Sequence, residues 1–165
     1  MIINYIHRII WFVGLVLLQV LILNQIHLWG YATPFLYLYF ILKLESGTSR
    51  HEQMLWAFFL GLTIDIFSNT PGMNAAATVF LAFIRPFLLR LFTPRDILDS
   101  IVPSFKSMGN LPFVKYIISA VCIQNLILLS IESFSFSSSL QLFLRVIACS
   151  AITIVGILGI ESIRK

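Results

Sequence analysis

Charged side chains are scarce in this sequence. Only 11% of its 165 residues are Asp, Glu, Lys or Arg, whereas 59% are hydrophobic. A soluble domain ordinarily carries about 25% charged residues, so this chain has too few to cover a surface that faces water. The shortage excludes a disordered chain, a free nucleic-acid-binding protein and an ordinary cytosolic enzyme. The class that remains is a small integral membrane protein, with one polytopic domain over residues 1–165.

Cysteines and the usual catalytic motifs are also scarce or missing. Two cysteines, Cys122 and Cys149, cannot form a disulfide framework, and both lie in apolar stretches that favour buried packing. The three histidines fall on different sides of the expected membrane, and no H-E-x-x-H, C-x-x-C or glycine-rich phosphate loop occurs. We therefore expect no enzymatic activity, no cofactor and no metal site.

Long apolar runs dominate what is present. A helix needs about 20 mainly apolar residues to cross the hydrocarbon core of a bilayer. Six runs are bounded by charged or turn residues: 9–28, 32–44, 54–69, 73–92, 113–131 and 140–160. They predict an all-α bundle of six transmembrane helices, although the second and third runs are short by this standard. The first run is interpreted as a retained signal anchor, because no A-x-A cleavage pattern follows it.

Lysine and arginine are unevenly distributed over the connections between these runs. Nine of the eleven lie in or beside the two tails and the second and fourth connections, whereas the stretches 24–34, 68–74 and 132–140 contain none. Because cytoplasmic connections are rich in these residues, the pattern predicts six crossings with both termini in the cytoplasm. In an alternative arrangement the two short runs form a re-entrant hairpin. This would place the charged connection 43–53 on the external side, against the positive-inside rule.

The connection 93–112 is long enough to form structure of its own. Thr93, Pro94 and Asp96 have the pattern of a capped helix start, and apolar residues then repeat at helical spacing as far as Phe105. The pattern predicts a short amphipathic helix on the inner membrane surface, kinked or ended near Pro103. This helix either seals the bundle or docks a cytoplasmic partner.

Three ionisable residues lie inside the apolar runs, where a charge costs about 2.5–3.5 kcal/mol: Asp65, Arg85 and Arg145. At 1.5 Å per residue, Asp65 and Arg145 lie at similar depths of about 6–7 Å from the outer ends of their runs. We hypothesise that Asp65 pairs with Arg145; alternatively, Arg145 pairs with Glu132 or extends to the external headgroups. Arg85, beside Pro86, is interpreted as extending to the inner interface.

A tight turn rich in Asn, Pro and Gly joins the third and fourth runs on the external side, and Asn74 can cap the helix that follows. Gly61 permits two helices to approach closely. Asp65 and Ser68 lie about one turn apart, where they can together satisfy backbone groups of the turn. We interpret six residues as a structural or interface motif: Gly61, Asp65, Ser68, Pro71, Gly72 and Asn74.

In this motif and in its size the chain resembles the MreD family, rod shape-determining membrane proteins of bacterial cell-wall elongation. The family pattern matches Gly61, Leu62, Asp65, Ser68, Pro71, Gly72 and Ala75, and Gln19 and the aromatic stretch 34–40 are also similar. The resemblance implies a multi-pass protein of the bacterial inner membrane, with a fold similar to the six-helix substrate-binding subunits of energy-coupling-factor transporters. It also implies a non-enzymatic scaffold that binds MreC, a single-span protein, and works with MreB, RodA and the elongation transpeptidase to position peptidoglycan synthesis.

Two other functions compete with the scaffold. A vitamin-binding subunit of an energy-coupling-factor transporter shares the size and helix count, but its first helix usually carries an A-x-x-x-A-like face, and here that helix has only Gly14. A small membrane enzyme is disfavoured because the polar residues do not converge. A homodimer is compatible with the small residues of the last run, which suit packing within the bundle equally well: Ala148, Ala151, Gly156 and Gly159.

Overall fold

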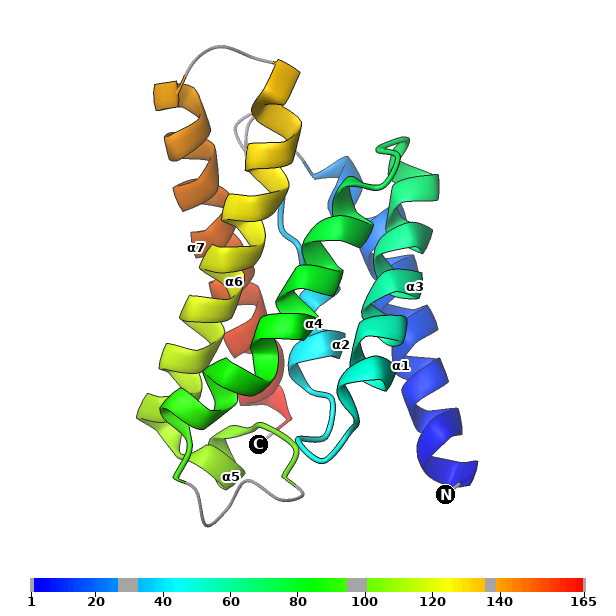
Figure 1. Cartoon of the computed structure of the whole chain (residues 1–165), viewed down its shortest axis with the longest axis vertical. Helices are drawn as coiled ribbons and strands as arrows, with labels where there is room; N and C mark the ends of the chain where they lie inside the picture. The colour runs from blue at the N-terminus through cyan, green and yellow to red at the C-terminus, as the bar shows by residue number, and fades with distance from the viewer. Residues whose placement is uncertain (1, 27–32, 95–100, 136–138, 165) are drawn as a thin grey trace.

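The computed structural model describes residues 2–26, 33–94, 101–135 and 139–164, and in these ranges every regular element is a helix (Figure 1). The five long helices are α1 (Ile2–Leu21), α3 (Arg50–Ser68), α4 (Met73–Phe92), α6 (Asn110–Glu132) and α7 (Ser139–Ile163). The short elements are α2 (Leu38–Leu42), α5 (Phe105–Met108) and the 3-10 turns η1 (Leu23–Gln25) and η3 (Ser133–Ser135). The all-α prediction is confirmed for the described residues.

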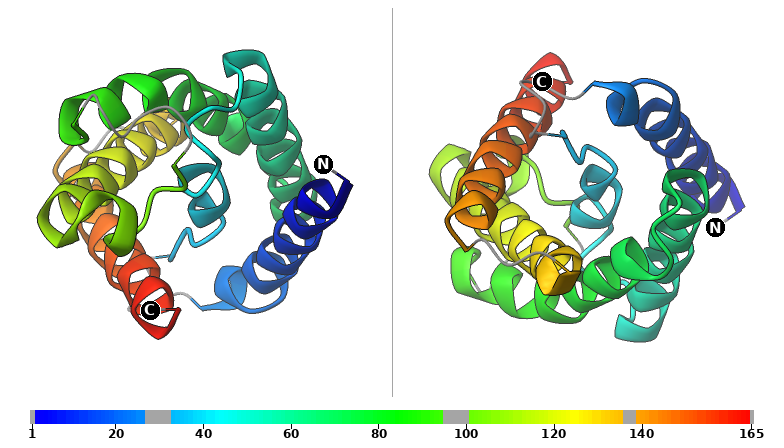
Figure 2. Two further views of the ribbon diagram at one scale, coloured as in Figure 1. Left: turned by 90° about the horizontal axis from the view of Figure 1, so that it is seen from below. Right: turned by 90° about the horizontal axis from the view of Figure 1, so that it is seen from above.

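Seen end on, the five long helices form a ring around α2 (Figure 2). Around this ring, α1 packs against α3, α3 against α4, α4 against α6, and α6 against α7, while α2 contacts α1, α3, α4 and α6. The described ends of the chain, the α2–α3 connection and α5 lie together at one end of the bundle (Figure 1). We call this the basic end, because the connections rich in Lys and Arg lie there.

Four helices are long and apolar enough to cross a membrane: Ile3–Gln25, Met73–Phe92, Asn110–Glu132 and Leu140–Ile163. They support the class of a multi-pass membrane protein, but they do not confirm the predicted count of six spanning helices. The third run is helical and starts earlier than expected, at Arg50, but it is not among these four.

The second run, 32–44, was wrongly predicted to be a spanning helix. Its helical part, α2, has five residues, which gives a length of about 7.5 Å. The residues from Tyr37 to Leu42 are each at most 5% exposed, so this stretch is enclosed by protein and does not face lipid. An enclosed segment and a lipid-facing helix both need apolar side chains, and hydropathy alone therefore cannot distinguish them.

The backbone of this interior segment, which we define as residues 34–44, is only partly helical and obtains hydrogen bonds from the surrounding ring. Gln19 of α1 donates to the Pro34 carbonyl at 2.9 Å, and the Phe35 amide donates to the Thr153 hydroxyl of α7 at 3.0 Å. Irregular backbone is tolerated at membrane depth only where protein satisfies its polar groups. Side chains of the ring helices thus make this interior path of the chain possible.

The connection between α4 and α6 differs from the predicted amphipathic helix. Thr93 follows the last residue of α4, and the predicted capping residue Asp96 lies outside the described residues. Within the described part, residues 101–103 are not helical, and the four-residue α5 begins after Ser104. Pro103 is compatible with this interruption, since its ring disfavours a continuous helix. The connection is also tied to the α2–α3 connection, because the Ser46 amide donates to the Ile101 carbonyl at 2.8 Å.

Candidate functional site

The predicted motif forms the turn between α3 and α4, at the end of the bundle opposite the basic end (Figure 1). α3 ends at Ser68, and the next residue, Asn69, adopts the left-handed conformation with φ 54°. Gly72, which precedes α4, also has a positive φ, 79°. Asn and Gly are the residues that adopt positive φ at lowest cost. The sequence therefore encodes this tight turn directly.

Asp65 caps α4 from the preceding helix. One carboxylate oxygen, Oδ1, accepts hydrogen bonds from the backbone amide and the side-chain amide of Asn74, both at 2.9 Å. The other, Oδ2, accepts from the Ala75 amide at 2.9 Å. These amides belong to the first turn of α4, where the helix dipole and the amides without a partner inside the helix favour a negative charge. Asp65 is only 3% exposed, so its charge is stabilised by these donors and not by water.

The expectation that Asn74 caps α4 was wrong, because Asn74 is the second residue of that helix and is itself bound by Asp65. Its side-chain oxygen instead accepts a hydrogen bond from the Tyr37 hydroxyl at 2.8 Å. The Thr70 hydroxyl also donates to Asp65 at 2.9 Å. The network therefore connects the turn to the interior segment through Tyr37.

Ser68 does not share the role of Asp65. Its hydroxyl accepts a hydrogen bond from the Asn24 side chain at 2.7 Å, and Asn24 accepts in turn from Gln19 at 3.1 Å. Ser68 thus connects the end of α3 to η1, whereas Asp65 binds the start of α4. The prediction that both residues satisfy the turn backbone together is wrong for Ser68.

Gly61 does permit close approach of two helices, as predicted. A Cβ atom at this position would lie 2.5 Å from the Cα atom of Ala75 and from the hydroxyl of Thr78. Because Ala75 is contacted at its backbone, no side-chain rotation could relieve the clash. The motif therefore has a buried part that packs α3 on α4, and an exposed tip formed by Pro71 and Gly72.

Arg145 is paired with Glu132, at 3.2 Å. This is the alternative to the hypothesis that Arg145 pairs with Asp65, and the described contacts of Asp65 are with the turn and with α4. The packing of the helices explains the outcome, since α7, which carries Arg145, packs mainly against α6, whereas α3 packs mainly against α4. Similar depth was thus insufficient to identify the partner.

Arg85 is fully buried and does not extend to the inner interface, so that interpretation was wrong. Its guanidinium donates to the Gln53 side chain at 3.0 Å and to the Leu42 carbonyl at 3.4 Å, and it also binds the Leu44 carbonyl. The Tyr116 hydroxyl donates to Leu42 as well, at 3.3 Å. A cation is favourable beside such carbonyls, which carry partial negative charge at a helix end. Arg85 therefore holds the last part of the interior segment.

Sequence reasoning missed several buried polar residues that take part in this interior. Each lies inside an apolar run or directly beside one, and that position is itself a signal, because a polar group inside a membrane protein needs a partner. They are Gln53, Gln124, Asn125, Thr153 and Glu161.

The other small and sulfur-containing residues are placed as follows. Cys149 is buried as expected, but Cys122 is exposed on α6. The small residues proposed as one face of α7 do not share one environment. Gly156 lies against Leu36 of the interior segment, whereas Gly159 has open space beside it. Among the residues that the structure describes, no three His, Cys, Asp or Glu side chains form a metal-binding group.

Comparisons with known proteins do not assign this chain to a class. No family model matches it, and neither a curated protein nor a solved structure matches it.

Proposed function

We propose that this chain is a non-enzymatic membrane scaffold of the MreD kind, which binds an MreC-like single-span protein in the bacterial inner membrane. Through that protein or directly, it would work with MreB, RodA and the elongation transpeptidase in positioning peptidoglycan synthesis. The supporting observation is that the residues carrying the resemblance, Gly61, Asp65, Pro71 and Gly72, belong to one compact turn that fixes α3 against α4.

The contacts of the intramembrane charges suit a structural role. Asp65 caps α4, Arg85 holds the interior segment, and Arg145 is paired with Glu132. Each of these groups is engaged with the protein itself, as a rigid support for other proteins requires. A relay of protons or a reaction centre would instead use titratable groups that face a substrate path.

The outer face of α3 is the surface that we assign to the partner. Ile66 and Phe67 are 70% and 62% exposed, and the exposed tip Pro71–Gly72 lies directly beyond them. A single-span partner with an external domain would contact the apolar side chains within the membrane and the tip outside it. This surface therefore fits the two-part shape of an MreC-like protein.

Site-specific photocrosslinking in cells tests the proposal. A photoreactive residue at position 66 or 67 should capture a single-span protein that has an external domain. The same residue at Phe143, which is exposed on α7, and at the buried Ile64 of α3 should not. Equal capture from position 143, or no protein captured from 66 and 67, would contradict the assigned surface. Tight binding of a vitamin by the purified chain would favour the transporter alternative instead.

A further inference from the structure

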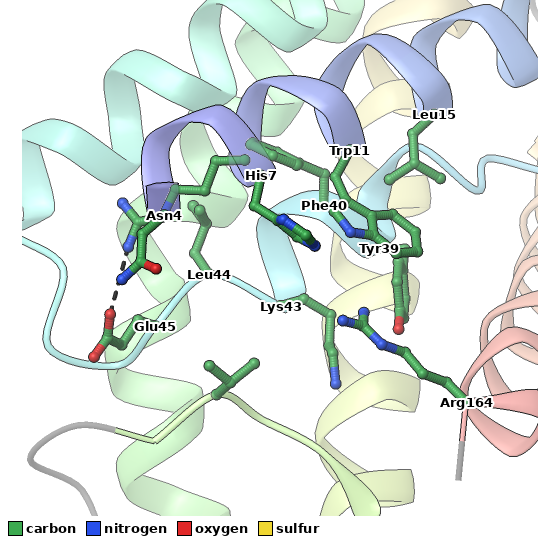
Figure 3. Close-up of a pocket in the computed structure, with 12 residues that line it drawn as sticks. Asn4, His7, Trp11, Leu15, Tyr39, Phe40, Lys43, Leu44, Glu45 and Arg164 are labelled. Atoms are coloured by element: carbon green, nitrogen blue, oxygen red, sulfur yellow. Dashed lines mark hydrogen bonds and ion pairs between the residues drawn. The ribbon is translucent and has the colours of Figure 1, made fainter. Parts of the chain in front are cut away.

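A cavity of about 300 Å³ opens at the basic end, between α1, the α2–α3 connection and the end of α7 (Figure 3). Its lining includes Arg8, Trp11, Leu15, Lys43 and Arg164. A second cavity of about 210 Å³ shares Lys43 and Arg164 with the first, and both therefore adjoin the same pair of cations. The scaffold function proposed above makes no use of this space.

Two cations direct unused hydrogen-bond donors toward the cavity. Lys43 donates to Glu161 at 2.9 Å and to the Pro103 carbonyl at 2.7 Å, which leaves one of its three N–H groups. Arg164 forms no ion pair with a carboxylate of the described residues. Its guanidinium interacts with the Tyr39 hydroxyl and lies 4.8 Å from the centre of the Trp11 ring, which leaves further N–H groups of the five for a ligand. Figure 3 shows the Arg164 guanidinium extending toward Lys43. The two side chains thus offer donors and positive charge to one common space.

The remaining charges of the cavity do not neutralise this pair. Arg8 is engaged with Glu52 at 2.9 Å and with Glu45 at 3.4 Å, which leaves one negative charge in this group of three. Lys106, which lines the second cavity, adds one more cation, so four cations stand against three carboxylates around the two cavities. Glu161 is the carboxylate that pairs with Lys43, and it lines the second cavity together with Arg164. Burial lowers the pKa of Lys43, and the nearby Arg164 charge lowers it further, whereas Glu161 raises it. An additional anion would stabilise both cations.

The wall of the cavity formed by α1 is polar near the start of the helix and apolar farther along it. Asn4 and Arg8 line its polar part, and Trp11 and Leu15 continue the same stripe toward the middle of the bundle. Arg8 and Leu15 are separated by seven residues, about 10 Å along the helix axis. A ligand that follows this wall would place a charged group near the end of the bundle and an apolar part deeper. This is the shape of an amphiphile lying in one leaflet.

We propose that this cavity binds the phosphate headgroup of an anionic phospholipid, with the phosphate between Lys43 and Arg164 and the apolar part of the lipid along Trp11 and Leu15. Lys and Arg are strong donors to phosphate oxygens, and basic pockets at the cytoplasmic side of membrane proteins recognise such headgroups. The site is independent of the partner surface on α3, because it lies at the opposite end of the bundle.

Native mass spectrometry of the purified full chain, stripped of bound lipid, tests this proposal. The probes are phosphatidylglycerol, phosphatidylcholine with the same acyl chains, and glycerol 3-phosphate. We expect phosphatidylglycerol to bind more tightly than either of the others. Arg164→Gln should weaken that binding about tenfold, as expected for the loss of one charge-assisted interaction. Arg164 follows the last helix and is exposed, so this variant should keep the fold, which its unfolding temperature would verify.

The matched control is Arg90→Gln, which removes an exposed cation from the last turn of α4 without touching the cavity. Phosphatidylglycerol binding should be unchanged in this variant. An equal loss in both variants would mean a general attraction to basic surface and would overturn the site. Glycerol 3-phosphate binding as tightly as the lipid would assign the cavity to a soluble phosphate, and equal binding of phosphatidylcholine would remove the role of the anion.

Discussion

At the scale of single residues, Asp65 shows how a fold can accommodate a charge that is costly to bury. Its carboxylate receives two backbone amides of α4, a side-chain amide and the Thr70 hydroxyl. The sequence identified Asp65 as an intramembrane charge that needed a partner, but depth alone pointed to Arg145. Three of the four donors are amides of the next helix, and a sequence does not show which backbone amides will be available to donate. Which helices are neighbours must be known before such a partner can be chosen.

We predict that Asp65→Ala lowers the free energy of unfolding by about 3 kcal/mol, because it leaves the buried amides of Asn74 and Ala75 without acceptors. Asp65→Asn should cost less, since it retains one acceptor oxygen. Thermal unfolding in detergent measures both changes. Thr63→Ala is the control, because that hydroxyl donates only within its own helix. Unchanged stability together with lost partner binding would mean that Asp65 acts at the interface and not in folding.

At the scale of elements, the interior segment is the least predictable part of the fold. Its apolar composition is that of a membrane span, yet the ring helices enclose it and its polar backbone depends on Gln19, Arg85, Tyr116 and Thr153. Apolar runs predicted the long helices well, because lipid-facing and core-facing positions both exclude charge. They could not predict an enclosed segment, since enclosure depends on side chains that are distant in sequence.

Removal of Arg85 should loosen this segment. We predict that Arg85→Met destabilises the protein by about 3 kcal/mol, because the Leu44 carbonyl and the Gln53 side chain lose their described donor in a buried site. Arg85→Lys should recover only part of the loss in stability, since one ammonium group cannot reproduce the donor geometry of the planar guanidinium. Arg90→Met, which changes an exposed arginine of the same helix, should have little effect. Equal unfolding temperatures for the two Met variants would refute this role of Arg85.

At the scale of the whole molecule, the distribution of Lys and Arg over the connections agrees with the directions in which the helices run. The connections rich in Lys and Arg lie at one end of the bundle, together with both described ends of the chain (Figure 1). The sequence predicted this grouping because the positive-inside rule acts on connections, and connections are visible in the sequence. It could not reveal the basic cavity, which arises only where α1, α7 and the α2–α3 connection meet.

The proposed orientation can be tested with single cysteines in a chain that lacks Cys122 and Cys149. Gly47 lies in the α2–α3 connection at the basic end, and Phe134 lies at the other end of the bundle and is 98% exposed. In spheroplasts, a membrane-impermeant thiol reagent should label the variant Phe134→Cys at once. It should label Gly47→Cys only after the membrane is permeabilised. The reverse pattern would place both termini outside the cytoplasm.

The enclosed path of the interior segment also has a consequence for biogenesis. Residues 34–44 are synthesised early, whereas the hydroxyl that receives the Phe35 amide belongs to Thr153 of the last helix. During translation this stretch therefore lacks part of its final hydrogen bonding, and its polar backbone must remain near water or near the translocation machinery. The last helix joins the others only when the chain is nearly complete. Chains cut short before α7 would consequently expose this backbone, which gives quality-control proteases a means to recognise them.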